Sequence, residues 1–401
     1  MTKLRSLRGA LLGAAALLGL AAPASAAEPG LTDQEILIGL FAPMSGQLAA
    51  FGFDPLQAAK MWYEEINKKG GIHGRKIKVV IEDDKCSPTE AVAVVKKLVT
   101  VDKVFLVNGG SCTAAAVATQ EFVTREKVPF VMLNAAGDGG VFPPTRYMFG
   151  AFGGTQRTVG ATIMEFAIKE LKGKKIAFIA HDDDFGNSNW STAQAVAKRL
   201  GAEVVAIERI PPRITDVTAP MLKIRAANPD VLISTAYPAP AVLIAQKYAE
   251  YGMTKIPLVQ AVQGVPIPAV YAKNVGNPAA LTNFYYGSPL NDLTDGPKQQ
   301  KWIDLYKTYY PDRKPGAFMT YGLPSAMAIT MALEKAGKDV TREKFVDAME
   351  TLDFDSGVIA GPTVFGKDRR DGSRASVFIK FDGTKHTLMP GVYLWNGKDG
   401  M

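Results

Sequence analysis

Two stretches of the sequence gather residue types that can do chemistry. The first, GGSCTAAA, covers residues 109–116, follows the apolar run VFLVN and carries Cys112 after a glycine pair. A cysteine in such a turn can act as a nucleophile when a histidine lies beside it to take its proton. The sequence has three histidines: His73, His181 and His386. Each falls in a separate predicted element, so we do not expect a cysteine nucleophile.

The second stretch, HDDDFG at residues 181–186, sets one histidine beside three aspartates. Imidazole and carboxylate groups bind metals, but consecutive residues of one loop rarely direct their side chains at one ion. The alternative is a solvated loop after a strand, in which an aspartate caps the next helix. EDDK, residues 82–85, is interpreted in the same way, as a charged turn that leaves a strand. The sequence also lacks a Walker loop, a G-x-G-x-x-G motif and a G-x-S-x-G motif, so we expect no metal, no cofactor and no enzyme.

The N-terminus predicts export. Three cations begin the chain: Lys3, Arg5 and Arg8. The apolar run that follows at 9–22 is too short to span a bilayer, and Ala-Ser-Ala at 24–26 is a cleavage pattern of small residues. We therefore expect residues 1–26 to be a cleaved signal peptide and the mature protein to be periplasmic. No cysteine lies near the cleavage site, so we expect no lipid anchor.

Export also changes the interpretation of the two cysteines, Cys86 and Cys112. In an oxidising compartment an isolated pair is more typical of a disulfide than of a metal site or a catalytic thiol. The net charge of +7 includes the three cations of the predicted signal, which leaves +4, and no run of five or six cations is present. We therefore expect no nucleic-acid partner.

Short apolar segments alternate with longer helical patterns along most of the chain. A first series of predicted strands covers 36–41, 77–83, 104–110 and 128–133, with helices over 55–69 and 88–101. A second series places strands at 175–181, 203–210, 230–236 and 256–261, and helices at 156–171, 186–200, 216–227 and 240–251. Apolar strands separated by helices indicate parallel sheets covered on both faces, so we expect an α/β fold of two doubly wound lobes.

The last third of the chain has a different pattern. Its predicted elements are helices over 297–310, 317–336 and 341–350, followed by β-rich segments at 375–381 and 386–394. These strands are too few for a third α/β domain. We expect the elements to complete the two lobes, which makes each lobe discontinuous in sequence.

In an open parallel sheet, ligands bind outside the carboxyl ends of the strands. The turns predicted there are 43–52, 109–116, 133–140, 181–188, 235–240 and 262–266. Their small residues let backbone N–H groups approach a ligand, and the helix N-termini that follow favour an anion. The alternative, that these turns are only compact connections, stays open on composition alone.

From about residue 34 to its end the chain resembles the type I periplasmic binding proteins, specifically the branched-chain amino acid (Leu/Ile/Val) receptors of ABC importers. The motifs that carry the resemblance are IGLFAPMSGQLAAFG, INKKGGIHGRKIKVVIEDDKCSPTEAV, VNGGSCTAA, FVMLNAAG, GKKIAFIAHDDDFG and GAFMTYGLPSAMAI. The resemblance implies two doubly wound lobes joined by a three-crossover hinge. It divides the chain into residues 27–151 with 284–368 for the N-terminal lobe, and 152–283 with 369–401 for the C-terminal lobe.

The resemblance also implies a Cys86–Cys112 disulfide and a ligand site. In the family the position of Thr113 holds the ligand carboxylate through its hydroxyl and backbone N–H, and the backbone at Ala135 contacts the ligand. The complete predicted site is Ser45, Phe51, Thr113, Ala135, Ala136, Gly137, Phe185, Tyr237 and Gln263.

Five positions show where this chain departs from the family pattern or retains it. Gly137 replaces a Ser or Thr, and the neutral Gln263 replaces the carboxylate that faces a ligand ammonium. A buried ammonium without an anion costs several kcal/mol, so a zwitterionic amino acid is disfavoured unless Asp138 or an acid at 182–184 supplies the charge. Phe51 and Phe185 stand at aromatic positions and Tyr237 is retained, which predicts an aromatic slot, although the phenylalanines have packing of the lobes as an alternative role.

These residues predict a small carboxylate ligand with an aromatic or apolar body, such as a benzoate-like or phenylpropanoid-like acid. The resemblance implies a monomeric receptor that closes on its ligand and delivers it to the permease and ATPase subunits of an ABC importer in the inner membrane. Two alternatives remain: a sensor of the same fold that reports to a signalling partner, and a conventional branched-chain amino acid receptor.

Overall fold

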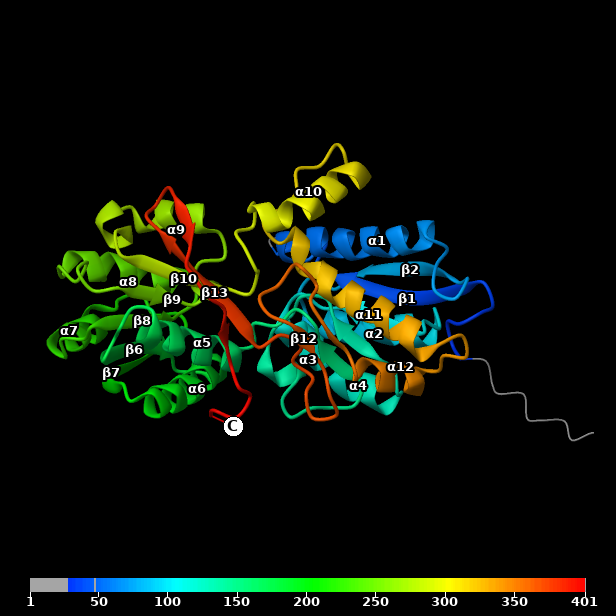
Figure 1. Ribbon diagram of the computed structural model, residues 1–401, viewed down its shortest axis with the longest axis horizontal. Coiled ribbons are helices and arrows are strands. Elements are labelled where there is room, and N and C mark those ends of the chain that lie inside the picture. The colour runs from blue at the N-terminus through cyan, green and yellow to red at the C-terminus, as the bar shows by residue number, and fades with distance from the viewer. Residues whose placement is uncertain (1–27, 47, 401) are drawn as a thin grey trace, which may run out of the picture.

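The computed structural model describes residues 28–46 and 48–400 and separates them into two α/β lobes that lie side by side (Figure 1). The predicted signal peptide at 1–26 lies outside these residues. No helix within the described ranges is long and apolar enough to cross a membrane.

The first lobe is built on a parallel sheet with the strand order β2-β1-β3-β4-β5. Its strands are β1 (Glu35–Ala42), β2 (Lys76–Asp83), β3 (Leu106–Gly109), β4 (Phe130–Met132) and β5 (Met148–Gly150). One face packs against α1 (Phe53–Lys68), α11 (Leu323–Ala336) and α12 (Arg342–Met349). The other packs against α2 (Pro88–Thr100), α3 (Thr113–Ala118) and α4 (Gln120–Arg125). Because both faces are covered, the strands are almost continuously apolar.

The second lobe has the strand order β14-β13-β10-β9-β8-β6-β7. The strands are β6 (Lys175–His181), β7 (Glu203–Ile210), β8 (Val231–Thr235), β9 (Leu258–Gln260), β10 (Phe284–Ser288), β13 (Ala375–Phe381) and β14 (His386–Leu388), with β15 (Tyr393–Leu394) paired to β13. Helices α5 (Gln156–Lys169) and α6 (Asp184–Leu200) cover one face. Helices α7 (Thr218–Ala226), α8 (Pro238–Glu250) and α9 (Pro268–Val275) cover the other. Strands β6 to β10 run parallel, and β13 runs antiparallel to β10.

Smaller elements complete the two lobes. They are α10 (Pro297–Tyr309), the hairpin β11 (Asp353–Phe354) and β12 (Thr363–Val364), and the 3₁₀ helices η1 (Ala49–Phe51), η2 (Asp138–Gly140), η3 (Val262–Gly264), η4 (Pro278–Leu281) and η5 (Met319–Gly322). The α/β class and the two parallel sheets predicted from sequence are confirmed.

Two predicted lobe boundaries are wrong. The sequence placed residues 284–288 in the N-terminal lobe, but this segment is β10, which pairs with β9 at Tyr286 and Gln260 and with β13 at Tyr286 and Ile379. These ladder hydrogen bonds hold the segment in the second sheet, so the chain returns to the first lobe only after Ser288. A second boundary, at 368/369, is wrong as well, because the backbone N–H of Gly150 donates to the carbonyl of Arg370 at 2.8 Å and Gly150 forms a bridge with Asp371, which keeps this segment beside β5 of the first lobe. The boundary at 151/152 stays a prediction.

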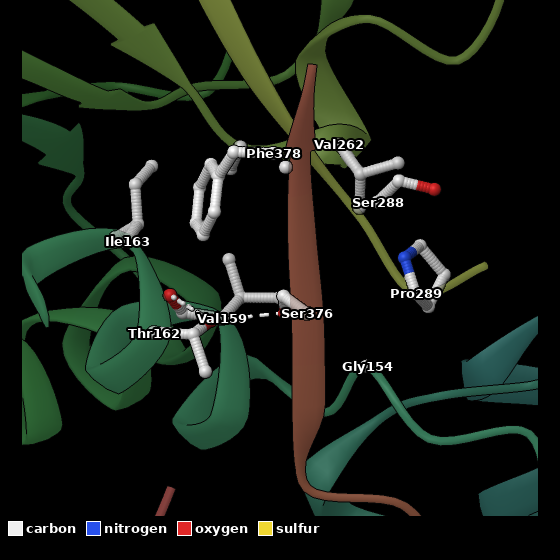
Figure 2. Close-up of a pocket in the computed structure, with 11 residues that line it drawn as sticks. Gly154, Val159, Thr162, Ile163, Val262, Ser288, Pro289, Ser376 and Phe378 are labelled. Atoms are coloured by element: carbon white, nitrogen blue, oxygen red, sulfur yellow. Dashed lines mark hydrogen bonds between the residues drawn. The ribbon is translucent and has the colours of Figure 1, made fainter. Parts of the chain in front are cut away.

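The chain therefore passes between the lobes three times: between β5 and α5, after β10, and before β13 (Figure 1). A cavity of about 10 Å³ lies where the crossings meet, lined by Gly154 from the first, Pro289 from the second and Ser376 from the third (Figure 2). The Oγ1 atom of Thr162 on α5 lies 2.9 Å from the Oγ atom of Ser376. This cavity has room for about one water molecule and is too small for a solute.

A buried ion pair ties the segment before the third crossing to the first lobe. The guanidinium of Arg370 is 2% exposed and lies 2.6 Å from the carboxylate of Glu350, which is 6% exposed. Nε of Arg370 donates to the carbonyl of Thr145 at 2.7 Å, and its guanidinium lies 4.5 Å from the ring centre of Phe149. The pair joins α12, the turn before β5 and the segment that leads to β13.

We predict that Arg370→Met lowers the free energy of unfolding by about 3 kcal/mol, because it leaves a buried carboxylate without its main partner. Urea unfolding followed by circular dichroism measures the change. Lys78→Met is the control, because the Lys78–Glu35 pair is 58% and 49% exposed and its loss should cost less than about 1 kcal/mol. Equal losses in the two variants would contradict the prediction.

Candidate ligand-binding site

A disulfide frames the first half of the site. Cys86, in the turn after β2, and Cys112, in the turn after β3, are bonded with their Cα atoms 5.5 Å apart, which confirms the pairing implied by the family resemblance. Because β1 lies between β2 and β3 in the sheet, the bridge spans the end of β1. Cys112 is the N-cap residue of α3, so the bridge also fixes where this helix begins.

Thr113 follows the disulfide as the first residue of α3. Its side chain is half-buried, and within the described parts of the chain no residue forms a hydrogen bond with its hydroxyl. The turn after β4 brings Gly137 against it, since a Cβ atom added to Gly137 would lie 1.8 Å from Cγ2 and 2.9 Å from Cβ of Thr113. The structure thus places these two predicted site residues in contact.

Ala135 and Ala136, which precede Gly137, both contact other parts of the first lobe. The backbone N–H of Ala135 donates to the carbonyl of Gly110 at 3.2 Å, so this N–H is already used within the lobe. Ala136 is half-buried and packs against the apolar cluster that contains Phe152. The carbonyl of Ala135 accepts no hydrogen bond from the described residues.

Ser45 and Phe51 come from the turn after β1. The hydroxyl of Ser45 donates to the carboxylate of Asp83 at 2.6 Å, at an exposed position. The ring of Phe51 stacks on Phe318 with ring centres 4.8 Å apart, and the carbonyl of Phe51 accepts from the side chain of Asn134. Sequence reasoning missed Phe318, because the GAFMTYG segment that contains it counted only as a family motif.

The second half of the site is an aromatic cluster on the other lobe. Tyr237, at the N-cap of α8, stacks on Phe185 of α6 with ring centres 4.8 Å apart. Its hydroxyl lies 3.4 Å from Oδ2 of Asp183. Burial, together with the nearby charge of Asp183, raises the pKa of Tyr237 to about 12, so the hydroxyl keeps its proton at neutral pH.

Asp183 also begins α6. Its Oδ1 accepts the backbone N–H of Gly186 at 2.9 Å, which confirms the interpretation of HDDDFG as a loop with a helix cap. Over the described ranges no group of three His, Cys, Asp or Glu side chains is arranged to hold a metal ion.

Gln263 lies in η3, after β9. Its Oε1 atom is buried and has no hydrogen-bond partner among the residues with described positions. Among the described residues, no hydrogen bond or ring contact joins its side chain to the Phe185–Tyr237 pair. Gln263 therefore brings an unused acceptor to this edge of the lobe but does not join the aromatic cluster.

The sequence offered Asp138 or an acid at 182–184 as a substitute for the missing countercharge. Asp138 is paired, because Nε of Arg157 lies 3.4 Å from its Oδ2 atom. Burial raises the pKa of Asp138, against the lowering effect of hydrogen bonding and of the Arg157 charge. Asp183 has no ion-pair partner in the described structure, and it is the acid beside the aromatic cluster.

The two halves remain separate. Among described residues, no hydrogen bond, ion pair or ring contact joins Thr113 or residues 135–137 to Phe185, Tyr237 or Gln263. Both halves lie in turns that follow the carboxyl ends of parallel strands, where open α/β sheets bind their ligands. The arrangement gives hydroxyl and small-residue surfaces on one lobe, and stacked rings with acceptor oxygens on the other.

Comparison with known proteins identifies relatives that share this architecture. Residues 35–385 match the protein family described as periplasmic binding protein. A Leu/Ile/Val-binding protein homolog from Brucella abortus is 27% identical over 379 residues, which are 91% of this chain and 92% of the relative.

Two solved structures have the same fold. The chain superimposes with a TM-score of 0.69 on a branched-chain amino acid transporter substrate-binding protein from Streptococcus pneumoniae in complex with isoleucine, at 22% identity over 90% of this chain and 99% of that one. It superimposes with a TM-score of 0.67 on a solute-binding protein of an ABC transporter from R. palustris in complex with benzoate, at 19% identity over 91% and 98%.

The disulfide generates one prediction. Replacing both Cys86 and Cys112 by Ala should lower the free energy of unfolding by about 3 to 4 kcal/mol, since the bridge closes a loop with a sequence separation of 26 residues. Urea unfolding without reductant measures the loss. The wild-type protein unfolded in dithiothreitol should show a similar loss, and a double variant as stable as the oxidised protein would disprove the prediction.

Gly137 generates a second prediction. Gly137→Ala should destabilise the protein by about 1 to 3 kcal/mol, because rotating Thr113 cannot move its own Cβ atom away from the new methyl group. The matched control is Gly139→Ala in the same turn, where the new methyl group would lie 3.5 Å from the nearest atom, in ordinary contact. Thermal unfolding that ranks the two variants in the opposite order would count against this packing.

Proposed function

The chain belongs to the periplasmic binding proteins of type I, the family of the Leu/Ile/Val receptors, and from this premise we propose that it is the solute receptor of an ABC importer. The members of this family are binding proteins and not enzymes. The proposed partners are therefore a permease and its ATPase in the inner membrane, with the periplasm as the site of capture.

The proposed ligand is a small carboxylate with an aromatic or apolar body. The observation that carries this proposal is the stacked pair Phe185–Tyr237 at the carboxyl edge of the second sheet. Stacked aromatic rings offer a flat apolar surface that suits a planar or branched apolar group. The structural relative from R. palustris was solved with benzoate, which has this chemistry.

The carboxylate end of the ligand is assigned to the first lobe. The unpaired hydroxyl of Thr113 can donate to a carboxylate oxygen, and Gly137 leaves the surface beside it without a side chain of its own. A hydrogen bond to a charged group contributes about 1.5 to 3 kcal/mol. Thr113 is therefore proposed as the main polar contact of the carboxylate.

A second candidate is an amino acid, and Asp183 is the observation that favours it. This acid touches the hydroxyl of Tyr237 and has no ion-pair partner in the described structure, so it is placed to accept from a ligand ammonium. It can equally accept from a hydroxyl on an aromatic ring. In either case the ligand has a donor group opposite its carboxylate.

Capture is proposed to proceed by closure about the three crossings. The ligand first meets one lobe, and contacts to the second lobe form only when the two halves approach. These additional contacts shift the equilibrium toward the closed form, which the permease then recognises.

A ligand screen tests the function. We expect benzoate, 4-hydroxybenzoate or 3-phenylpropionate to raise the melting temperature in thermal-shift assays, with dissociation constants then measured by calorimetry. Tight leucine binding without a response to the aromatic acids would support the second candidate instead. Absence of binding by every acid and amino acid tested would rule out both.

The same calorimetry tests the role of Thr113. Thr113→Val keeps the shape of the side chain and removes the hydroxyl, so we expect an affinity loss of about 10- to 100-fold. Thr100→Val, at the exposed end of α2 in the same lobe, should leave the affinity unchanged. Unchanged affinity in the Thr113 variant would remove this residue from the site.

A further inference from the structure

His181 is a buried titratable residue that the proposed binding mechanism leaves unused. It ends β6 with 0% of its surface exposed, directly before the loop that carries Asp183 and leads to Phe185 in α6. Its ring reaches across the carboxyl edge of the sheet to both neighbouring strands. Nδ1 lies 3.4 Å from the carbonyl oxygen of Ile210 at the end of β7, and Nε2 lies 2.7 Å from the backbone nitrogen of Tyr237 after β8.

These two contacts define the protonation of the ring. The backbone N–H of Tyr237 can only donate, so Nε2 of His181 must accept and carries no proton. The carbonyl of Ile210 can only accept, so Nδ1 carries the proton. The arrangement therefore requires neutral imidazole with its proton on Nδ1.

The contact with Tyr237 positions more of the site than the hydrogen-bonded atoms alone. Tyr237 is the N-cap of α8, so its backbone position sets where that helix begins. The rings of His181 and Tyr237 also stack with centres 4.2 Å apart, and the ring of Phe185 lies 6.3 Å from His181. His181 thus supports both the backbone and the ring of the residue assigned to the ligand.

Two charged residues belong to the segments that contact the imidazole. Asp183, on the loop after β6, favours the protonated ring. Arg209 of β7 precedes Ile210 and is held by the carbonyl of Gly186 and the side chain of Asn187. Burial outweighs the effect of Asp183 and the backbone carbonyls, so the pKa of His181 is lowered from its ordinary value of 6.5.

We propose that His181 is a positioning residue of the solute site: its neutral ring holds Tyr237 in place, and proton uptake at Nε2 releases Tyr237 and weakens solute capture in acid. A proton on Nε2 would face the N–H of Tyr237, so two donors would meet where one hydrogen bond now lies. The ligand contact of Tyr237 rests on the proposed function, whereas the link between His181 and Tyr237 does not.

The first experiment uses the ligand-free protein. Because the chain has three histidines, their ring signals can be assigned in NMR spectra with His73→Gln and His386→Gln variants. On titration from pH 8 to pH 4.5 we expect the ring of His181 to titrate below pH 6.5, and the backbone amide of Tyr237 to shift with the same midpoint. A Tyr237 amide that stays in place while His181 titrates, or a ring that stays neutral throughout, overturns the proposal.

The second experiment measures affinity for benzoate and for leucine by calorimetry at pH 7.5 and pH 5. We expect wild-type affinity to fall about fivefold or more in acid, as for the loss of one hydrogen bond. His181→Gln, which keeps an acceptor oxygen that does not titrate, should reduce this pH dependence to less than twofold. His181→Phe keeps a ring without an acceptor and should bind weakly at both pH values.

His386→Gln is the matched control, because His386 lies in the second lobe, where it is half-buried, and contacts Tyr286 rather than Tyr237. It should keep the wild-type pH dependence. Wild-type affinity that is equal at the two pH values, or a pH dependence retained in His181→Gln, overturns the proposal. If neither probe binds at any pH, the proposed function fails, while the titration of the ligand-free protein still decides whether His181 controls Tyr237.

Discussion

The architecture depends on one constraint: parallel strands deliver the turns that follow them to a single edge of their sheet. In the first lobe this edge receives the disulfide, Thr113 and residues 135–137, which lie far apart in sequence. In the second it receives His181 and Tyr237. The central strands of each sheet are buried on both faces and supply rigid positions. The residues that could contact a ligand lie in short turns, and the sheet fixes the positions of these turns.

Much of this arrangement was readable from the sequence. Apolar runs of strand length between helical patterns predicted the two parallel sheets, because burial on both faces leaves a simple pattern. The pairing of Cys86 and Cys112 came from the family resemblance and is confirmed. Tertiary contacts account for what was missed: β10 could not be assigned to its lobe, since only its ladder partners reveal it. Phe318, which stacks on Phe51, comes from a distant segment with no local signal.

Some polar atoms of the candidate site have no hydrogen-bond partner among the described residues, as is also true of several buried polar atoms elsewhere in the lobes. The hydroxyl of Thr113 and the Oε1 atom of Gln263 have no partners within the described chain, although most buried polar groups in proteins do. Asp138 forms an ion pair with Arg157 at 3.4 Å, although its Oδ2 atom accepts no hydrogen bond within the described residues. Donors and acceptors that have no partner within the described chain are available to a solute, and such groups lie on both lobes.

The late position of β13 in the chain has a consequence for how the protein is made. This strand pairs with β10 inside the second sheet, yet nearly all of the chain precedes it. The core of the first lobe similarly requires α11 and α12, which also come late in the chain. Neither lobe can complete its core before the last third of the chain has been synthesised. Contacts between such distant segments also slow folding.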